Sequence, residues 1–394
     1  MHHREYVRAT GINLLFTFCI YLYYPILAPY IKSMGLDDFQ TALVFSILPL
    51  VMIFSSPIMG RLADNVGRIR VIILGLILEI IAMILYIVSV NISLIIIARV
   101  LDAVAIAGVI LVAIAKIEDS LSEKERGKYA GWSLSLAQIG AIIGPIVGGL
   151  MADKLFVRAP FMLTAVILLV MAFMLASKTS KLKKKVERKN FNWLAEIKHF
   201  LSIKELRGMA ILGVVMHASI PATQVFLPLF IIERLGLSYT YVGIAIFFFG
   251  VMHLFQFYFG SLSNKYGRAT MTMFGCFLFA FFMFLMSTAH SYWLLLVILL
   301  CAGAGTAIWN VSAWTLMSGI GEKLNREGEI VGSYMSIAKT GGFISFIFSG
   351  LIVQVFSIEV LFMFNAFLIA IGLLFAARFF DRKNILSEKV SKHL

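Results

Sequence analysis

Charged residues are scarce in this chain of 394 residues: 14% are Asp, Glu, Lys or Arg, whereas soluble domains average about 25%. Hydrophobic residues make up 60% of the chain, and the mean hydropathy is +0.93. A globular domain this apolar would not stay dispersed in water. The composition therefore excludes a soluble protein and predicts a polytopic membrane protein.

Cysteine and enzyme motifs are also sparse. Cys19, Cys276 and Cys301 each lie in an apolar stretch without a second Cys or His at ligand spacing, so we expect no disulfide, no metal and no cofactor. The chain has no H-E-x-x-H, G-x-S-x-G or phosphate-loop motif. An enzyme has no positive support, and a sensor would need an output domain larger than the longest loop, 178–207. Both are kept as alternatives from other functional classes.

Acidic residues are outnumbered: 21 Asp and Glu face 34 Lys and Arg, for a net charge of +13. In a soluble chain this excess would raise the question of nucleic acid. With the N-terminus inside, however, only Lys32, Lys154, Arg158 and Arg234 fall outside. The charge therefore predicts orientation in a plasma membrane with both termini cytoplasmic, and no nucleic-acid partner.

Long apolar runs dominate what is present, and each can cross a hydrocarbon layer of ~30 Å. They fall at 11–33, 41–59, 71–89, 92–115, 129–151, 158–176, 208–232, 240–259, 270–288, 291–317, 330–353 and 358–377. We predict an all-α fold of twelve transmembrane helices.

A basic linker divides the runs into two halves. The predicted organisation is a six-helix half over 1–177, a cytoplasmic linker over 178–207, a second six-helix half over 208–380 and a cytoplasmic tail over 381–394. The end of the linker spaces Phe191, Leu194, Ile197, Phe200 and Leu201 as an amphipathic helix at the membrane surface would. Its lysines are expected to contact membrane lipids.

An internal repeat relates the two halves. Residues 60–68, GRLADNVGR, recur 200 positions later as 260–268, GSLSNKYGR, each between the second and third runs of its half. Pro29 and Pro228, and Gly35 and Gly236, keep nearly the same offset. Two pseudo-symmetric six-helix halves are typical of secondary transporters, whose site lies between the repeats.

The stretch 60–70 resembles the loop 2-3 signature of the major facilitator superfamily. Gly60 and Gly67 are expected to allow close approach and a sharp turn, with Asp64 able to pair with Arg61, Arg68 or a helix end. The resemblance implies that this loop, including Arg70, is a conformational latch that closes the cytoplasmic side. The second copy has Asn264 in place of Asp64, and a loop that only marks topology is the alternative.

The fourth run carries Arg99 and Asp102 one helical turn apart, and charges inside a span are functional candidates. A hairpin turning near Asn91 places Glu79 level with them, so we predict one intramembrane cluster that handles the coupling proton. Family members often show R-x-x-q-G here, which this chain matches only at Arg99. A permanently paired network that fixes helix packing is the alternative.

The fifth run contains a pattern similar to the antiporter signature of drug exporters in the family. Residues 140–149, GAIIGPIVGG, match G-x-x-x-G-P-x-x-G-G completely. Gly140, Gly144 and Gly148 share one flat helix face, Pro145 bends the span, and Gly149 completes the pattern. Many proton-coupled exporters carry an acid in the first span, which this chain lacks.

Candidate cavity residues come from the spans that line the central cavity in this family: Tyr24, Gln138, His217, Gln224, Trp309, Asn310, Trp314 and Lys339. Each aromatic alone is as typical of ordinary packing. Lys339 is the strongest candidate because it lies too deep to reach water easily, and its repeat mate is Gln138. It needs an anion, from the protein or from the substrate.

We therefore expect a secondary transporter that works by alternating access and exports amphipathic small molecules in exchange for protons, as a monomer. The alternative within transport is a symporter or uniporter for a small polar or anionic metabolite. Lys339 and the missing acid of the first span favour this alternative.

Overall fold

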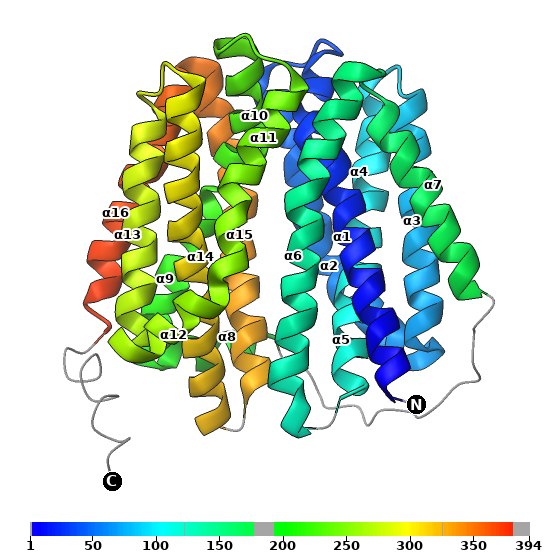
Figure 1. The fold of residues 1–394 in the computed structure, drawn as a ribbon. Coiled ribbons are helices and arrows are strands. Elements are labelled where there is room, and N and C mark those ends of the chain that lie inside the picture. The colour runs from blue at the N-terminus through cyan, green and yellow to red at the C-terminus, as the bar shows by residue number, and fades with distance from the viewer. Residues whose placement is uncertain (1, 122, 177–192, 325, 381–394) are drawn as a thin grey trace. The chain divides into compact units, whose positions relative to one another are not determined.

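The computed structural model describes residues 2–121, 123–176, 193–324 and 326–380, and every regular element among them is helical (Figure 1). The first half contains α1 (His2–Lys32), α2 (Asp38–Val66), α3 (Arg68–Val88), α4 (Ile92–Ile106), α5 (Val112–Asp119), α6 (Glu123–Lys154) and α7 (Ala159–Ala176). Then follow α8 (Trp193–Ser202), α9 (Lys204–Ala218), α10 (Leu227–Leu229), α11 (Tyr239–Gly250), α12 (Gln256–Tyr266), α13 (Arg268–Met286), α14 (Tyr292–Lys323), α15 (Glu327–Val355) and α16 (Ile358–Ala377).

Short stretches of non-α helix join several of these elements into longer spans. They are π-helical at Ala107–Leu111, Ala222–Phe226 and Phe230–Arg234, and 3-10 helical at Val251–Phe255. With these joined, the described residues form twelve helices long and apolar enough to cross a bilayer. The structure thus confirms the predicted all-α fold with twelve spans in a multi-pass membrane protein.

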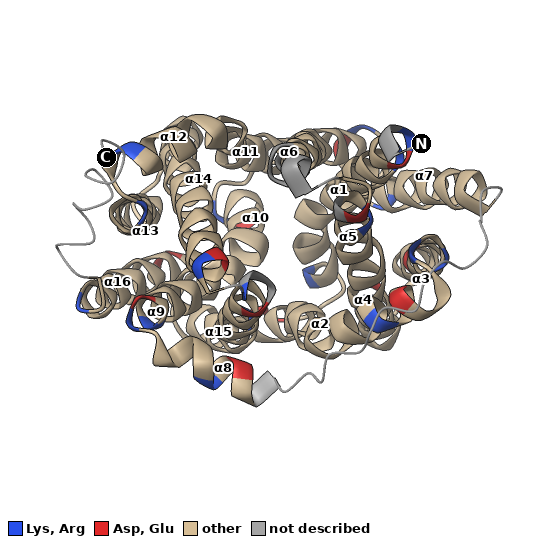
Figure 2. Ribbon diagram, turned by 90° about the horizontal axis from the view of Figure 1, so that it is seen from below, with Lys and Arg blue, Asp and Glu red and all other residues tan. Residues whose placement is uncertain are grey.

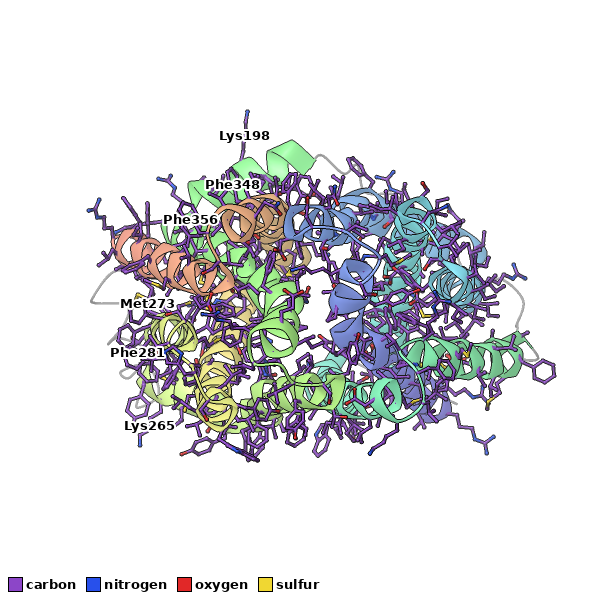
Figure 3. All side chains as sticks on the ribbon, turned by 90° about the horizontal axis from the view of Figure 1, so that it is seen from above. Lys198, Lys265, Met273, Phe281, Phe348 and Phe356 are labelled. Atoms are coloured by element: carbon purple, nitrogen blue, oxygen red, sulfur yellow. The ribbon has the colours of Figure 1, made fainter. Side chains whose placement is uncertain are left out.

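Large apolar side chains lie on the outside of the helices. Phe281 on α13 and Phe348 on α15 are 49% and 57% exposed, and both point away from the helices that carry them (Figure 3). Viewed from below, few ribbon segments are blue or red and the remaining ribbon is mostly tan (Figure 2). Together with the exposed apolar side chains, this composition matches an environment of hydrocarbon around the helices.

The chain divides into two compact units. Unit 1 comprises Met1–Arg188 and Leu227–Phe247, and unit 2 comprises Lys189–Phe226 and Phe248–Leu394. The units depart from the predicted halves at Leu227–Phe247, which belongs to the second half by the repeat but groups with unit 1. The π-helical turn at Ala222–Phe226 and the 3-10 stretch at Val251–Phe255 lie beside the two division points. Such interruptions often mark a bend.

The predicted repeat is visible in the backbone. Gly67 separates α2 from α3 with φ +99°, and Gly267 separates α12 from α13 with φ +97°. Gly35 and Gly236 also share positive φ, at 92° and 66°. Residues with side chains avoid this region, so both halves use glycine for the same two turns.

Helix α8 follows the basic part of the predicted linker. Its Phe200 is buried and Leu201 is 39% exposed, and its predicted place at the membrane surface stays a prediction. His199 Nδ1 lies 2.9 Å from Glu329 Oε1 and connects α8 to α15 within unit 2. The basic run and the predicted cytoplasmic tail lie outside the described residues.

Candidate functional site

A buried charged cluster joins α1, α3 and α4 in unit 1. Arg99 Nη1 lies 2.7 Å from Asp102 Oδ2, one turn along α4. The Tyr23 hydroxyl of α1 lies 3.0 Å from Glu79 Oε1 on α3 and 3.1 Å from Asp102 Oδ1. Arg99, Asp102 and Glu79 have no exposed surface, and neither does Tyr23. The structure confirms the predicted cluster of three charges and adds Tyr23 as the bridge between its two carboxyl groups.

Aromatic rings surround the guanidinium of this cluster. Arg99 Cζ lies 4.8 Å from the centroid of Phe45 and 5.7 Å from that of Tyr24, within the range of cation–π attraction. Tyr86 Oη lies 3.5 Å from Asp102 Oδ2, at the limit of a hydrogen bond. Tyr24, which the sequence assigned to the substrate cavity, therefore lies beside Arg99.

The cluster holds two carboxyl groups and one guanidinium. Tyr23 has a single hydroxyl hydrogen and donates to one carboxyl oxygen at a time. Within the described part of the chain, Glu79 Oε2 and the Arg99 Nε and Nη2 atoms are buried without a hydrogen-bond partner. A buried net charge is costly. One bound proton makes the group of Glu79, Asp102 and Arg99 electrically neutral.

The sequence analysis missed Tyr23, although helix depth held a signal. Tyr23 and Glu79 each lie nine residues before the last residue of their helix, and Asp102 lies ten residues after the first residue of α4. At a rise of about 1.5 Å per residue, these positions are level. Depth alone, however, does not separate Tyr23 from its neighbour Tyr24.

The loop between α2 and α3 pairs differently from the expectation. Gly67 makes the predicted sharp turn. Arg68 contacts Asp119 at the end of α5, with Nη2 at 3.1 Å from Oδ1. Asp64 is exposed and forms no hydrogen bond or ion pair with any described residue. The possible pairing of Asp64 with Arg68 is therefore absent, because Asp119 occupies the guanidinium.

Two further residues of the predicted latch lie at this loop. A Cβ atom at Gly60 would meet no described atom within 4 Å, so the close approach expected there is wrong. The reason is that Gly60 lies inside α2, on a part of the helix that faces open space. Arg70 Nη1 lies 3.3 Å from the Val66 carbonyl oxygen and closes the end of α2.

The small-residue face of α6 packs directly on α1. Cβ atoms at Gly140 and Gly144 would lie 2.7 and 2.9 Å from backbone oxygens of α1, and a Cβ at Gly148 would overlap the Leu22 carbonyl. Side chains cannot fit at such distances. The predicted flat face is confirmed, and its partner is the helix that carries Tyr23.

The other side of α6 packs on α11, also within unit 1. A Cβ at Gly149 would overlap the carbonyl of Tyr239, and a Cβ at Gly243 would overlap that of Pro145. The complete antiporter-type pattern therefore serves two contacts, with glycines 140, 144 and 148 toward α1 and positions 145 and 149 toward α11.

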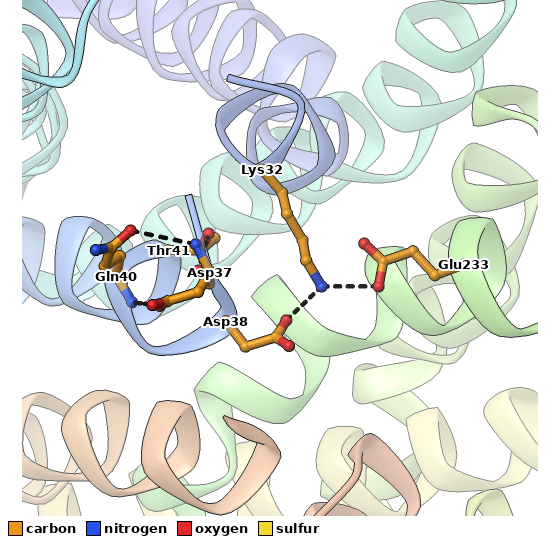
Figure 4. Close-up of polar contacts among 6 residues, drawn as sticks. All are labelled: Lys32, Asp37, Asp38, Gln40, Thr41 and Glu233. Carbon is orange, nitrogen blue, oxygen red and sulfur yellow. Dashed lines mark hydrogen bonds and ion pairs between the residues drawn. The ribbon is translucent and has the colours of Figure 1, made fainter. Parts of the chain in front are cut away.

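An ion-pair group lies where α1 ends. Lys32 Nζ lies 2.5 Å from Asp38 Oδ1 and 2.8 Å from Glu233 Oε2 (Figure 4). Asp37 accepts from the Gln40 N–H at 2.7 Å and caps α2, which holds Asp38 in the first turn. Lys32 thereby ties Leu227–Phe247, which contains Glu233, to the rest of unit 1.

Asp153 makes a second connection at the same segment. Its carboxylate accepts from the backbone N–H groups of Tyr239 and Thr240 at 3.1 and 2.8 Å, and also from the Ser238 and Thr240 hydroxyls. A carboxylate at a helix N-terminus satisfies donors that have no partner in the helix. Asp153 of α6 thus caps α11, a contact that the sequence analysis did not foresee.

In unit 2, three of the predicted cavity residues form a group. The rings of His217 on α9 and Trp309 on α14 meet edge to face, with centroids 5.8 Å apart. Lys339 lies on α15 one turn before Gly342, at which a Cβ atom would lie 3.5 Å from the His217 carbonyl oxygen. The remaining candidates are the partly buried Gln138, Gln224 and Asn310 and the exposed Trp314. Their roles in a cavity stay predictions.

Metal ligands do not gather in the residues that the structure describes: no three His, Cys, Asp or Glu side chains there could hold an ion together. Cys19 and Cys276 are buried free thiols, and Cys301 is partly buried.

Comparison with known proteins places this geometry in context. The sequence profile of the Major Facilitator Superfamily matches residues 9–323 and 209–393. An uncharacterized MFS-type transporter of Methanocaldococcus jannaschii is 26% identical over 360 residues, covering 89% of this chain and 92% of that protein. The quinolone resistance protein NorA of Staphylococcus aureus is 26% identical over 359 residues, covering 90% and 91%.

Solved structures show the same fold. The nucleoside transporter NupG, solved as a point mutant, aligns with a TM-score of 0.81 at 12% identity, over 96% of this chain and all of that one (100%). The human organic anion transporter MFSD10 aligns with a TM-score of 0.68 at 15% identity, over 95% and 99%. At these identities the likeness concerns the fold alone.

Proposed function

This chain belongs to the Major Facilitator Superfamily and is a membrane transporter, and from that premise we propose that it exports amphipathic small molecules in exchange for protons. Relatives named for quinolone resistance support export, and so does the complete glycine pattern of α6 with its two close contacts. No enzymatic step is needed for this activity, because the proton gradient supplies the free energy.

The single observation that carries the proposal is the surplus carboxyl group around Arg99. Glu79 and Asp102 share the Tyr23 hydroxyl and one guanidinium. One proton neutralises this group, and loss of that proton leaves a buried negative charge that is costly in hydrocarbon. The cluster would therefore bind or release a proton when the distance between Asp102 and Arg99 changes, or when the access of Asp102 to water changes.

Alternating access requires that each side of the membrane can be closed. We assign the outer closure to Lys32 with Glu233 and to Asp153 with the start of α11. The cytoplasmic closure is assigned to the loop that contains Asp64, whose carboxylate is exposed and available to a partner. Only one closure is expected to form at a time.

The proposal includes a location and partners. The positive residues in the predicted inner loops support a cytoplasmic location of both termini, and a gradient-driven exporter is expected in the plasma membrane. The partners are small-molecule substrates, protons and membrane lipids, with a monomer as the working unit. Gln138, Gln224, Asn310 and Trp314 are proposed to line the path of the substrate.

The test is transport by purified protein in proteoliposomes. Cationic dyes, sugars and organic anions are compared with and without an imposed pH gradient. Exchange predicts that substrate moves against its own gradient only when protons move the opposite way, and that added substrate releases or takes up protons. Transport of any substrate that ignores the pH gradient would contradict proton exchange.

A symporter or uniporter for a small polar or anionic metabolite is the second candidate. It is favoured by Lys339, a cation inside a span with no partner among the described residues. The same liposomes separate the two candidates. A symporter accumulates substrate on the side toward which protons flow, and a uniporter accumulates nothing.

A further inference from the structure

Lys339 lies deep in the membrane-spanning part of α15. It follows the start of the span Glu329–Val355 by ten residues, which places it about 15 Å along the helix. The side chain is too short to reach water at the helix end. Across the described residues, Lys339 forms neither a hydrogen bond nor an ion pair. Its ammonium group therefore has no anionic partner within the described residues, although a cation inside a span ordinarily pairs with one.

The neighbours of Lys339 are fixed by close packing of α15 on α9. A Cβ at Gly341 would lie 2.8 Å from the Val214 carbonyl oxygen, and one at Gly342 would lie 3.5 Å from that of His217. Lys339 precedes Gly342 by three residues and so shares its side of α15. This places Lys339 on the side of α15 that contacts α9 near His217.

The groups around His217 offer hydrogen-bond donors without acceptors. His217 Nδ1 lies 2.9 Å from the Gly213 carbonyl oxygen, so this nitrogen carries a hydrogen. Trp309, whose ring contacts His217, has a buried Nε1–H that finds no acceptor in the described residues. An unsatisfied buried donor is destabilising. A ligand that accepts hydrogen bonds would remove this cost.

Carboxylates that could serve Lys339 are missing from this part of the chain. Within 206–321 and 330–380 the sequence contains two, Glu233 and Glu359. Glu233 belongs to unit 1 and pairs with Lys32. Glu359 is the second residue of α16, at a helix end. The membrane-spanning part of unit 2 thus supplies no carboxylate to Lys339, which leaves its charge to be balanced by a ligand.

We propose that Lys339 and the Trp309 N–H, beside the His217 ring, form an oxyanion subsite that binds a carboxylate, sulfonate or phosphate group of the transported molecule. The rings of His217 and Trp309, which contact each other, suit an aromatic or apolar body next to that group. The substrate class is thus an amphipathic organic anion or zwitterion. This inference rests on the proposed transport function and names its substrate class.

The test is equilibrium dialysis of the full-length protein, purified in an uncharged detergent, against three probes that share one aromatic body. Naphthoate carries a negative charge, naphthylmethanol none and naphthylmethylammonium a positive charge. We expect naphthoate to bind tightest. Lys339→Gln should weaken naphthoate binding about tenfold or more, because a charge-assisted contact is lost, and should leave or strengthen binding of the cation.

Two variants keep part of the subsite. Lys339→Arg retains the charge and should stay within about threefold of the unchanged protein. Trp309→Phe retains the ring but removes the N–H, and should weaken naphthoate binding about threefold without affecting naphthylmethanol. The matched control is Lys198→Gln, which removes one positive charge from the exposed face of α8, where Lys198 points away from the helices (Figure 3), and should leave all three affinities unchanged.

The proposal is overturned if naphthoate binds no tighter than naphthylmethanol, or if Lys339→Gln lowers the affinity of all three probes equally while thermal unfolding is unchanged. If Lys339→Gln does not fold, Trp309→Phe and the order of the three probes decide. Dialysis uses no gradient, so it measures the affinity for naphthoate separately from proton-driven transport. If the protein binds the anion but shows no pH-driven transport, only the exchange mechanism is rejected. If it shows pH-driven transport but no preference for the anion, only the subsite is rejected.

Discussion

Arg99 and Lys339 are both cations inside membrane-spanning helices, but their surroundings are opposite. Arg99 in unit 1 is paired with Asp102 and stands near a second carboxyl group, Glu79, through Tyr23. Lys339 in unit 2 has no described anion at all. The Arg99 site has one carboxyl group more than its cation needs, whereas the Lys339 site has none. On the proposed mechanism, the first site exchanges a proton and the second binds an anionic ligand.

The repeat shows how the two halves came to differ. At the offset of 200, Phe279 stands at the position of Glu79, and it is 1% exposed. Lys339 corresponds in turn to the uncharged Gln138. Each half has thus placed its charge where the other has a neutral residue. The shared features are backbone ones, such as the positive φ of Gly67 and Gly267.

The largest effect is expected from Asp102→Asn, which removes from the first site the carboxyl group that is paired with Arg99. Asn resembles the protonated acid but cannot release a proton, so uphill transport driven by a pH gradient should be lost while downhill exchange continues. The measurement is substrate-induced proton release from purified protein and gradient-driven uptake in liposomes.

Glu79→Gln is the matched comparison for that experiment, because it removes the carboxyl group that lacks a direct contact with Arg99. Its effect on coupling should be smaller. If Asp102→Asn still releases protons fully, or still accumulates substrate against its gradient, Asp102 does not carry the coupling proton. That role would then belong to Glu79 or to another site.

An intermediate effect is expected from Tyr23→Phe, which leaves every charge in place. The change takes one donor away from both Glu79 and Asp102, and an unsatisfied buried acceptor costs ~1–3 kcal/mol. We expect a fall of about fivefold in the coupled transport rate and a shift in its pH dependence, with naphthoate binding unchanged. Tyr24→Phe is the control. Equal effects of the two variants would deny Tyr23 a specific role in the cluster.

Much of this comparison could be predicted from the sequence. Hydrophobic runs gave the number of spans because a bilayer imposes a minimum length on each helix. The spacing of Arg99 and Asp102, with the hairpin register of Glu79, predicted the cluster because helices fix depth at a constant rise. The flat face of Gly140, Gly144 and Gly148 followed from helical periodicity in the same way.

Contacts between distant segments could not be predicted. Arg68 pairs with Asp119 because the loop brings it to the end of α5, and no spacing rule connects those positions. Gly60 was expected at a close approach but faces open space, since a glycine in sequence does not reveal which helix face is covered. Lys32 and Glu233 are 201 residues apart in sequence, and no pattern links them.

The smallest effect is expected at the Lys32 group. Lys32 and Glu233 side chains are 22% and 42% exposed, and an exposed ion pair contributes about 0.2–1 kcal/mol. Glu233→Gln should therefore shift the outer closure by only about two- to fivefold. The reporter is Thr41→Cys, because Thr41 is buried near the start of α2 and a membrane-impermeant maleimide reaches it only when this end opens.

Glu5→Gln is the control: it removes the similarly exposed partner of Lys116 near the start of α1 and should not change the labelling rate. Equal labelling in both variants would show that the Glu233 contact does not hold the segment Leu227–Phe247 in place, and the closure would then rest on Asp153, whose carboxylate binds two backbone N–H groups of α11 regardless of Lys32.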